Sequence, residues 1–143
     1  MSLNISYTAI LVAAIAGFVF SAIWYTALFG KTWAKEMGFD MNQKPEPGFM
    51  VKSLVMQFIG LLLLSYVFTH NIAAWQFVPG TKDAPWIANA ISAAVFTCVG
   101  FYVPTELGRV AWERKSWKLF IINVSYHLIS LIIMALIITK WIQ

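Results

Sequence analysis

The residues of this chain that could do chemistry inside an apolar environment are three polar side chains in its last apolar stretch. Asn123, His127 and Ser130 follow each other at i, i+4 and i+7, a spacing that places them on one face of a helix. The charge-free interval that holds them, residues 119–139, is centred close to His127, so the imidazole is predicted to lie near the middle of a bilayer. An ionisable side chain at that depth is costly and should face the interior of a bundle or water.

Two interpretations of His127 remain open. Its face could line a path for a solute or a proton, or His127 could stay neutral and join two spans through a hydrogen bond. The joining role is the favoured interpretation. Gln57 and Tyr25 complete the predicted intramembrane polar face, and Asn89 and Thr97 are further candidate partners across the bundle.

Other kinds of chemistry have no visible site in the sequence. There is no GxSxG motif, no HExxH motif and no pair of acids inside an apolar stretch. Glu106 and Glu113 are predicted to pair with Arg109 and Arg114 at the surface, and the single cysteine, Cys98, is predicted to be a packing residue. We therefore expect no enzymatic activity, no cofactor and no metal site.

Four long charge-free intervals must position these side chains. The chain has 143 residues, of which 60% are hydrophobic and only 11% charged, and the charges lie outside residues 2–30, 53–81, 84–105 and 119–139. About 20 apolar residues suffice for a helix to cross a bilayer. The sequence thus predicts an all-α integral membrane four-helix bundle, a single domain over residues 1–143 with spans at 4–29, 50–75, 85–104 and 117–140. Pro104 is expected to kink or end the third span.

The positive charges indicate the orientation of the bundle. The side that holds the loops at 30–49 and 105–116 carries eight of the ten Lys and Arg residues. The positive side of a membrane protein is cytoplasmic, so both termini are predicted to lie on the non-cytoplasmic side of the cell membrane. The net charge of +4 is explained by this bias and does not indicate a nucleic-acid partner.

The end of the first span is marked by aromatic and basic residues. Trp24, Tyr25 and Trp33 flank Lys31, as expected where a helix leaves the hydrocarbon. Gly30 is predicted to end the helix in a left-handed conformation, and a short interfacial helix that ends at Gly38 is predicted to follow.

A stripe of small residues runs along the first span at intervals of four. It comprises Ala9, Ala13, Gly17 and Ser21. Small residues on one face allow another helix to approach closely, so the stripe is predicted to be a packing surface. Its partner could be another span of the same chain or another subunit.

The chain resembles a known family at several of these positions. Trp24-Tyr25 followed by Phe29-Gly30-Lys31-Thr32-Trp33, the aromatic and basic third loop, and residues 119–127 are similar to the bacterial domain-of-unknown-function 1761 family. This resemblance implies a small four-helix bacterial membrane protein of unassigned activity, and it supplies no catalytic or ligand residues.

Two functional hypotheses follow. The first is a structural or accessory subunit, packed through its small-residue faces in a homo-oligomer or a larger membrane complex. The alternative is a small transporter or channel subunit with a polar path past His127. A cavity that reaches His127 would favour the transporter, whereas a dry interior with an exposed small-residue stripe would favour the accessory subunit.

Overall fold

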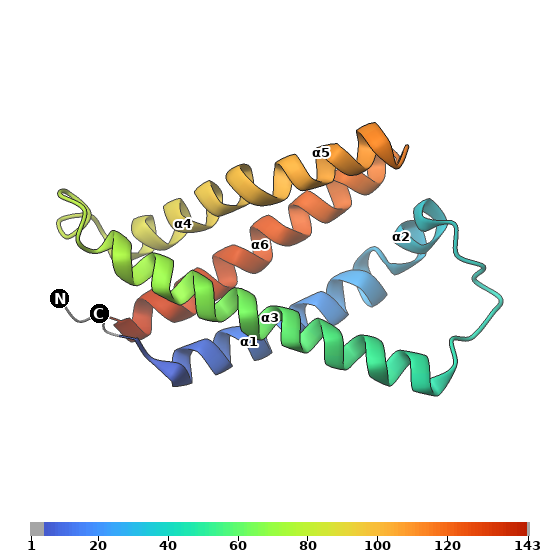
Figure 1. The fold of residues 1–143 in the computed structure, drawn as a ribbon, viewed down its shortest axis with the longest axis horizontal. Helices are drawn as coiled ribbons and strands as arrows, with labels where there is room; N and C mark the ends of the chain where they lie inside the picture. The colour runs from blue at the N-terminus through green and yellow to red at the C-terminus, as the bar shows by residue number, and fades with distance from the viewer. Residues whose placement is uncertain (1–4, 143) are drawn as a thin grey trace.

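The computed structural model describes residues 5–142, and the regular secondary structure over these residues is entirely helical (Figure 1). Its elements are α1 (Tyr7–Ala22), the π-helical turn η1 (Ile23–Leu28), α2 (Gly30–Met37), α3 (Pro47–Trp75), α4 (Trp86–Thr97), the π-helical turn η2 (Cys98–Tyr102), α5 (Val103–Trp112) and α6 (Trp117–Ile142). Four stretches are long and apolar enough to cross a membrane: Tyr7–Leu28, Pro47–Trp75, Trp86–Trp112 and Trp117–Ile142. The predicted all-α fold with four spans is therefore confirmed. Residue 4, where the first predicted span begins, lies outside the described residues.

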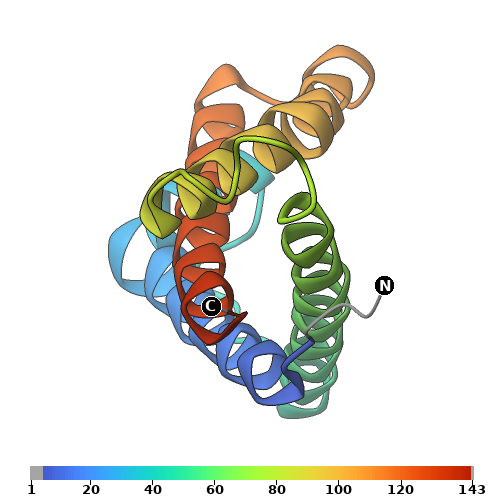
Figure 2. The ribbon, with the colours of Figure 1, turned by 90° about the vertical axis from the view of Figure 1, so that its left-hand side faces the viewer.

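The central helix of the bundle is α6. It packs along α1 and α4 and also contacts α3, and Figure 2 shows it between these neighbours. Leu131, Met134, Ala135 and Ile138 of α6 are completely or almost completely buried in the main core. Since these residues recur at intervals of three and four, one face of α6 supplies the centre of that core.

The small-residue face of α1 is covered by helices of the same chain. Ala9, Ala13, Gly17 and Ser21 are all buried. A Cβ atom at Gly17 would lie 3.3 Å from both Leu61 Cδ2 of α3 and Met134 Sδ of α6, so Gly17 marks the place where three helices meet. At the other end of the α1–α3 contact, the Ser65 hydroxyl donates a 2.8 Å hydrogen bond to the Ile10 carbonyl.

The first span ends in a π turn. The amide of Phe29 donates to the carbonyl of Trp24, five residues earlier. Gly30 was predicted to end the first span in a left-handed conformation. This prediction was wrong, because Gly30 is the first residue of α2. It is required because a Cβ atom there would lie only 2.8 Å from the Tyr25 carbonyl oxygen. The predicted short helix is confirmed as α2, which ends at Gly38 with a φ of 79°.

The third span does not end at Pro104. Residues 105–112, assigned to a loop from the sequence, are helical and belong to α5. Proline lacks an amide proton and normally clashes with the carbonyl four residues earlier. Here the π turn η2 precedes Pro104, with the Val103 amide donating to Cys98, and it widens the backbone so that the helix continues.

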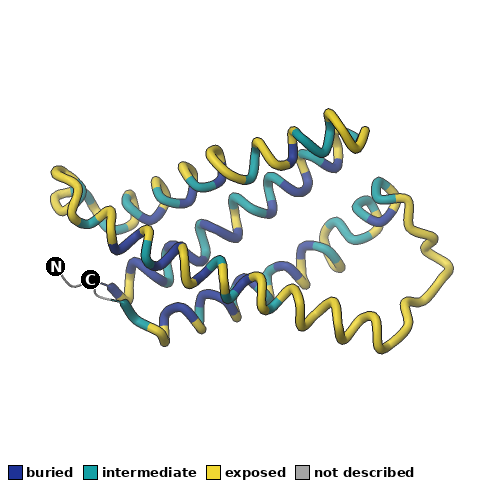
Figure 3. Tube along the Cα trace, in the orientation of Figure 1, coloured by how far each residue is buried: buried dark blue, intermediate teal, exposed yellow. Residues whose placement is uncertain are grey.

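One helix is only partly packed. Residues 47–57 of α3 are all exposed, whereas its other half, from Leu61 onward, contributes Ser65, Phe68, Thr69 and Ile72 to the interior. The tube in Figure 3 shows this change along α3. As a result, α3 lies against α1 and α6 near the chain termini and is uncovered near the α2 end of the bundle.

Candidate functional site

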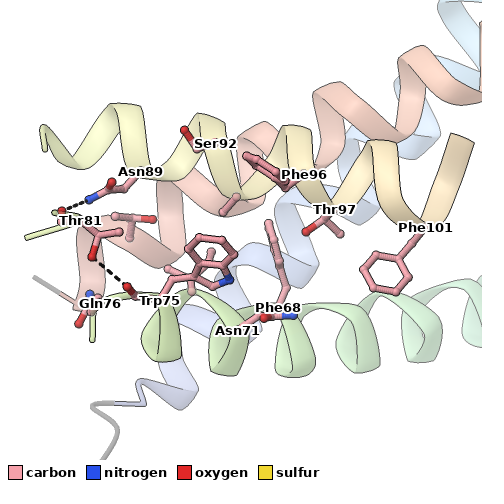
Figure 4. A pocket seen from close by; sticks show the side chains of 13 residues that line it. Phe68, Asn71, Trp75, Gln76, Thr81, Asn89, Ser92, Phe96, Thr97 and Phe101 are labelled. Atoms are coloured by element: carbon pink, nitrogen blue, oxygen red, sulfur yellow. Dashed lines mark hydrogen bonds between the residues drawn. The ribbon is translucent and has the colours of Figure 1, made fainter. Parts of the chain in front are cut away.

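A chamber of about 520 Å³ lies between α3 and α4 (Figure 4). Its apolar walls carry the aromatic rings of Phe68 and Trp75 on α3, Phe96 on α4 and Phe101 on η2. The rings of Trp75 and Phe96 approach to 6.2 Å between centroids, so they bridge the two walls. Phe96 is still 69% exposed, which places one ring of the chamber at the outer surface of the bundle.

Polar side chains line the chamber along its length, and three of them lie at the end near the chain termini. Gln76, Thr81 and Asn89 lie there, while Thr97 and Phe101 lie at the opposite end (Figure 4). The Asn89 side-chain amide donates a 2.8 Å hydrogen bond to the Thr81 carbonyl, which ties the connecting loop to α4. The end near the chain termini is thus lined mainly by polar side chains, whereas toward the middle of the bundle Asn71 and Thr97 lie among aromatic rings.

A second hollow of about 190 Å³ adjoins this polar end. It is lined by Gln76, Thr81, Asn89 and Thr139, which also line the chamber, and it adds Lys82. The Thr139 side chain on α6 thus faces both hollows. Its hydroxyl is buried and has no hydrogen-bond partner among the described residues.

A separate cavity of about 150 Å³ is lined by His127. Gln57, Ser130, Tyr102 and Tyr126 are among its lining residues. The His127 ring stacks on Tyr102 at 4.1 Å between centroids and meets Tyr126 edge-on at 5.0 Å. His127 therefore connects α6 to the third span through ring contacts. The residues that line this cavity are not shared with the chamber, so the two hollows do not form one lined path in the described part of the chain.

A polar network lies at the α2 end of the bundle. The Tyr25 hydroxyl donates to Asn123 Oδ1 at 3.0 Å, and Asn123 Nδ2 donates to Glu106 Oε2 at 3.0 Å. Arg109 Nη1 donates to both Glu106 oxygens, at 3.2 and 3.3 Å, and Arg109 Nε donates to Glu113 Oε2 at 3.4 Å. Glu106 is 6% exposed and is the one buried charged residue in the described part of the chain. The network joins the first span, the third span and α6.

The short helix α2 closes this end. Met37 Sδ accepts from Arg109 Nη2 at 3.8 Å, and Ser116 donates to the Glu36 carboxylate. Ser116 also caps α6, because its hydroxyl accepts from the Leu119 amide. The loop between α5 and α6 and the helix α2 are thereby held together by side-chain contacts.

The predicted polar face is divided between two places. Tyr25 and Asn123 meet in the network, while His127, Ser130 and Gln57 meet in the small cavity. The candidate partners Asn89 and Thr97 lie along the larger chamber instead.

The predicted pairing of Glu106 with Arg109 is present, but its predicted location at the surface was wrong. Because the third span continues past Pro104, Glu106 is carried inward against α6 and is buried beside Asn123. Glu113, seven residues further on, is exposed as expected. The sequence signal that could have revealed this is the i, i+3 spacing of Glu106 and Arg109 on a helix that continues through the proline.

The chamber was also missed. Its lining residues Phe68, Trp75, Phe96 and Phe101 were not among the predicted site residues. The chamber arises from the spacing between α3 and α4, which no local pattern encodes.

Comparison with known proteins gives one match. Residues 8–139 match the family described as "Protein of unknown function (DUF1761)", which confirms the resemblance found in the sequence. No curated protein and no solved structure matches the chain. Since the match covers nearly the whole chain, this four-helix membrane protein belongs to the DUF1761 family.

Proposed function

We propose that this protein binds a small, largely apolar solute within the membrane and acts as a transporter or as the solute-binding subunit of one. The observation that carries the proposal is the chamber between α3 and α4. Its volume of about 520 Å³ lies within the range of about 300–1,000 Å³ typical of small-molecule sites. Aromatic walls that also carry polar side chains are typical of such sites as well.

The position of the chamber supports access from the side of the bundle. Phe96 and Phe101 are 69% and 67% exposed, so the wall formed by α4 and η2 is open to the hydrocarbon. The π turn η2, which carries Phe101, interrupts the third span beside the chamber, and π turns are frequent at functional sites. An apolar solute that partitions into the bilayer would reach the chamber past the exposed rings of Phe96 and Phe101 without crossing water.

The proposal is tested by filling the chamber. Thr97→Trp and Asn71→Trp would each place a large ring into it, from the α4 wall and the α3 wall. Thr105→Trp is the matched control, because Thr105 is exposed and its hydroxyl bonds only to the Phe101 carbonyl one turn earlier. Each protein would be purified from native membranes in mild detergent and examined by native mass spectrometry.

We expect the unaltered protein and Thr105→Trp to carry the same bound small molecule, and both chamber variants to have lost it. Two chamber variants are used because each enters from a different helix, and loss of folding in one leaves the other informative. Identical spectra for all four proteins would contradict the proposed function.

The proposed location is the bacterial cytoplasmic membrane, with both termini outside. Support comes from the eight-to-two distribution of Lys and Arg residues. Lys44 and Lys82 are exposed at opposite ends of the bundle. In a Cys98→Ala background, Lys82→Cys should react with an impermeant maleimide on intact cells, and Lys44→Cys only after the cells are opened. Labelling of both from the same side would contradict the four-span arrangement.

A role as an accessory subunit in an oligomer is the second candidate. The small-residue stripe no longer supports it, since α3 and α6 of the same chain cover Gly17. The exposed face of α3 does support it, because residues 47–57 leave half a helix without a neighbour.

Cysteine cross-linking tests this second candidate. In the Cys98→Ala background, Val55→Cys on α3 should form a disulfide-linked dimer in oxidised membranes, whereas Ile121→Cys on the outer face of α6 should not. Equal and slow cross-linking of both would assign the α3 face to lipid.

A further inference from the structure

The chamber has chemically different ends, and this difference identifies the class of its ligand. Toward the middle of the bundle, the rings of Phe68, Phe96 and Phe101 form most of the wall, with Asn71 and Thr97 between them. Toward the chain termini, the lining changes to amides and hydroxyls, and the adjoining hollow of about 190 Å³ continues in the same direction to Lys82. A ligand that fits both parts must itself be apolar at one end and polar at the other.

Thr139 lines both hollows and lies where they adjoin. It is 4% exposed, and its Oγ1 atom has no hydrogen-bond partner among the described residues. A buried hydroxyl that lacks a partner costs free energy, because it has lost its hydrogen bonds to water. A ligand oxygen placed at this junction would accept the missing hydrogen bond.

The charge at the polar end is positive. Among the described residues, Lys82 is the only charged one that lines either hollow. A second ammonium group is close, since Lys140, next to Thr139, lies 5.5 Å above the centre of the Trp86 ring, and Trp86 also lines the smaller hollow. Asp83 follows Lys82 in the loop and does not line either hollow, so an anionic group at the mouth would meet cations first.

We propose that the ligand is a single-chain amphiphile with an anionic head group, of the fatty-acid type. Its chain lies between Phe68, Phe96 and Phe101, and its head group accepts from the Thr139 hydroxyl and faces Lys82. This inference rests on the proposed solute-binding function and specifies the ligand. Lys82 and Thr139 thereby become the residues that determine specificity for an anionic head.

The test uses a brominated fatty acid, because bromine quenches tryptophan fluorescence on contact and Trp75 lines the chamber. The full chain is reconstituted in phosphatidylcholine nanodiscs and titrated with 9,10-dibromostearic acid or with the neutral 9,10-dibromostearyl alcohol. Trp75→Phe identifies the part of the quenching that comes from the chamber. Lys82→Gln removes the cation at the mouth, and Lys44→Gln removes an exposed cation at the other end of the bundle as a control.

We expect saturable quenching by the acid that is lost in Trp75→Phe. Lys82→Gln should weaken the binding of the acid by about fivefold, the effect of one lysine on an anion near a membrane surface. Lys44→Gln should leave it unchanged, and the alcohol should bind more weakly and be insensitive to Lys82→Gln.

Two results would overturn the inference. Equal binding of acid and alcohol, with no effect of Lys82→Gln, would show a chamber that accepts neutral chains, and the proposed function would stand without an anionic ligand. Absence of saturable quenching by either probe would exclude a fatty-acid-type ligand. Native mass spectrometry of the chamber variants uses no added probe. It therefore tests the proposed solute binding independently of whether the ligand is a fatty acid.

Discussion

Replacing Glu106 with alanine is expected to destabilise the protein by about 3 kcal/mol, the low end of the range for breaking a buried ion pair. The carboxylate accepts hydrogen bonds from Asn123 and from Arg109, and it is 6% exposed. Its removal leaves the Asn123 amide without its acceptor inside the bundle. The expected loss of stability stays at the low end of this range because the Arg109 side chain is 26% exposed. It still pairs with Glu113 and remains in contact with water.

The matched control is Glu113→Ala. Glu113 pairs with the same arginine at 3.4 Å, but its side chain is 55% exposed, and exposed pairs typically contribute about 0–1 kcal/mol. Unfolding of each variant in mixed micelles of SDS and mild detergent, followed by circular dichroism, gives the free energies of unfolding. Equal, small effects of the two substitutions would show that Glu106 is not held as the structure describes.

The second large effect is expected from Gly17→Leu. The place of a Cβ atom at Gly17 is already within 3.3 Å of Leu61 and Met134. A leucine must push α3 and α6 away from α1, and such overpacking typically costs about 1–3 kcal/mol. The same unfolding measurement detects the loss.

Gly60→Leu is the control for Gly17→Leu. Gly60 lies in the middle of α3, and a Cβ atom there would meet nothing within 4 Å. The leucine should therefore be tolerated with little change in the free energy of unfolding. If Gly17→Leu were tolerated equally well, the three helices could not meet at Gly17.

Much of the fold was accessible from the sequence because its determinants are local. Charged residues are excluded from the spans because placing a charge in hydrocarbon is costly. The charge-free intervals therefore indicated four spans without any knowledge of how the helices pack. The short helix α2 was accessible for the same reason, since Gly38 marks its end with a backbone conformation that glycine favours. The spacing of small residues on α1 identified a packing face. Which helices pack against it, here α3 and α6, depends on the arrangement of the whole bundle.

The parts of the site that were missed depend on tertiary structure. The rule that proline interrupts a helix placed Glu106 in a loop, whereas the π turn before Pro104 keeps the helix intact and turns the carboxylate inward. The helical spacing placed His127 on one face with Asn123 and Ser130, but its contacts with Tyr102 and Tyr126 depend on how the third span crosses α6. The chamber depends on the distance between α3 and α4, which is set by packing along α1 and α6.

The central claim is that a specific solute, rather than bulk phospholipid, occupies the chamber between α3 and α4. Photo-cross-linking from Phe96 tests it most directly, because this ring lines the chamber and is 69% exposed, while Val99 on the next turn is 60% exposed and does not line it. Benzoylphenylalanine would be introduced at each position in turn, and each variant would be irradiated in native membranes. The cross-linked peptide would then be analysed by mass spectrometry. The structure predicts a discrete small-molecule adduct at position 96 and the general mixture of membrane phospholipids at position 99. The same phospholipid mixture at both positions would contradict the claim.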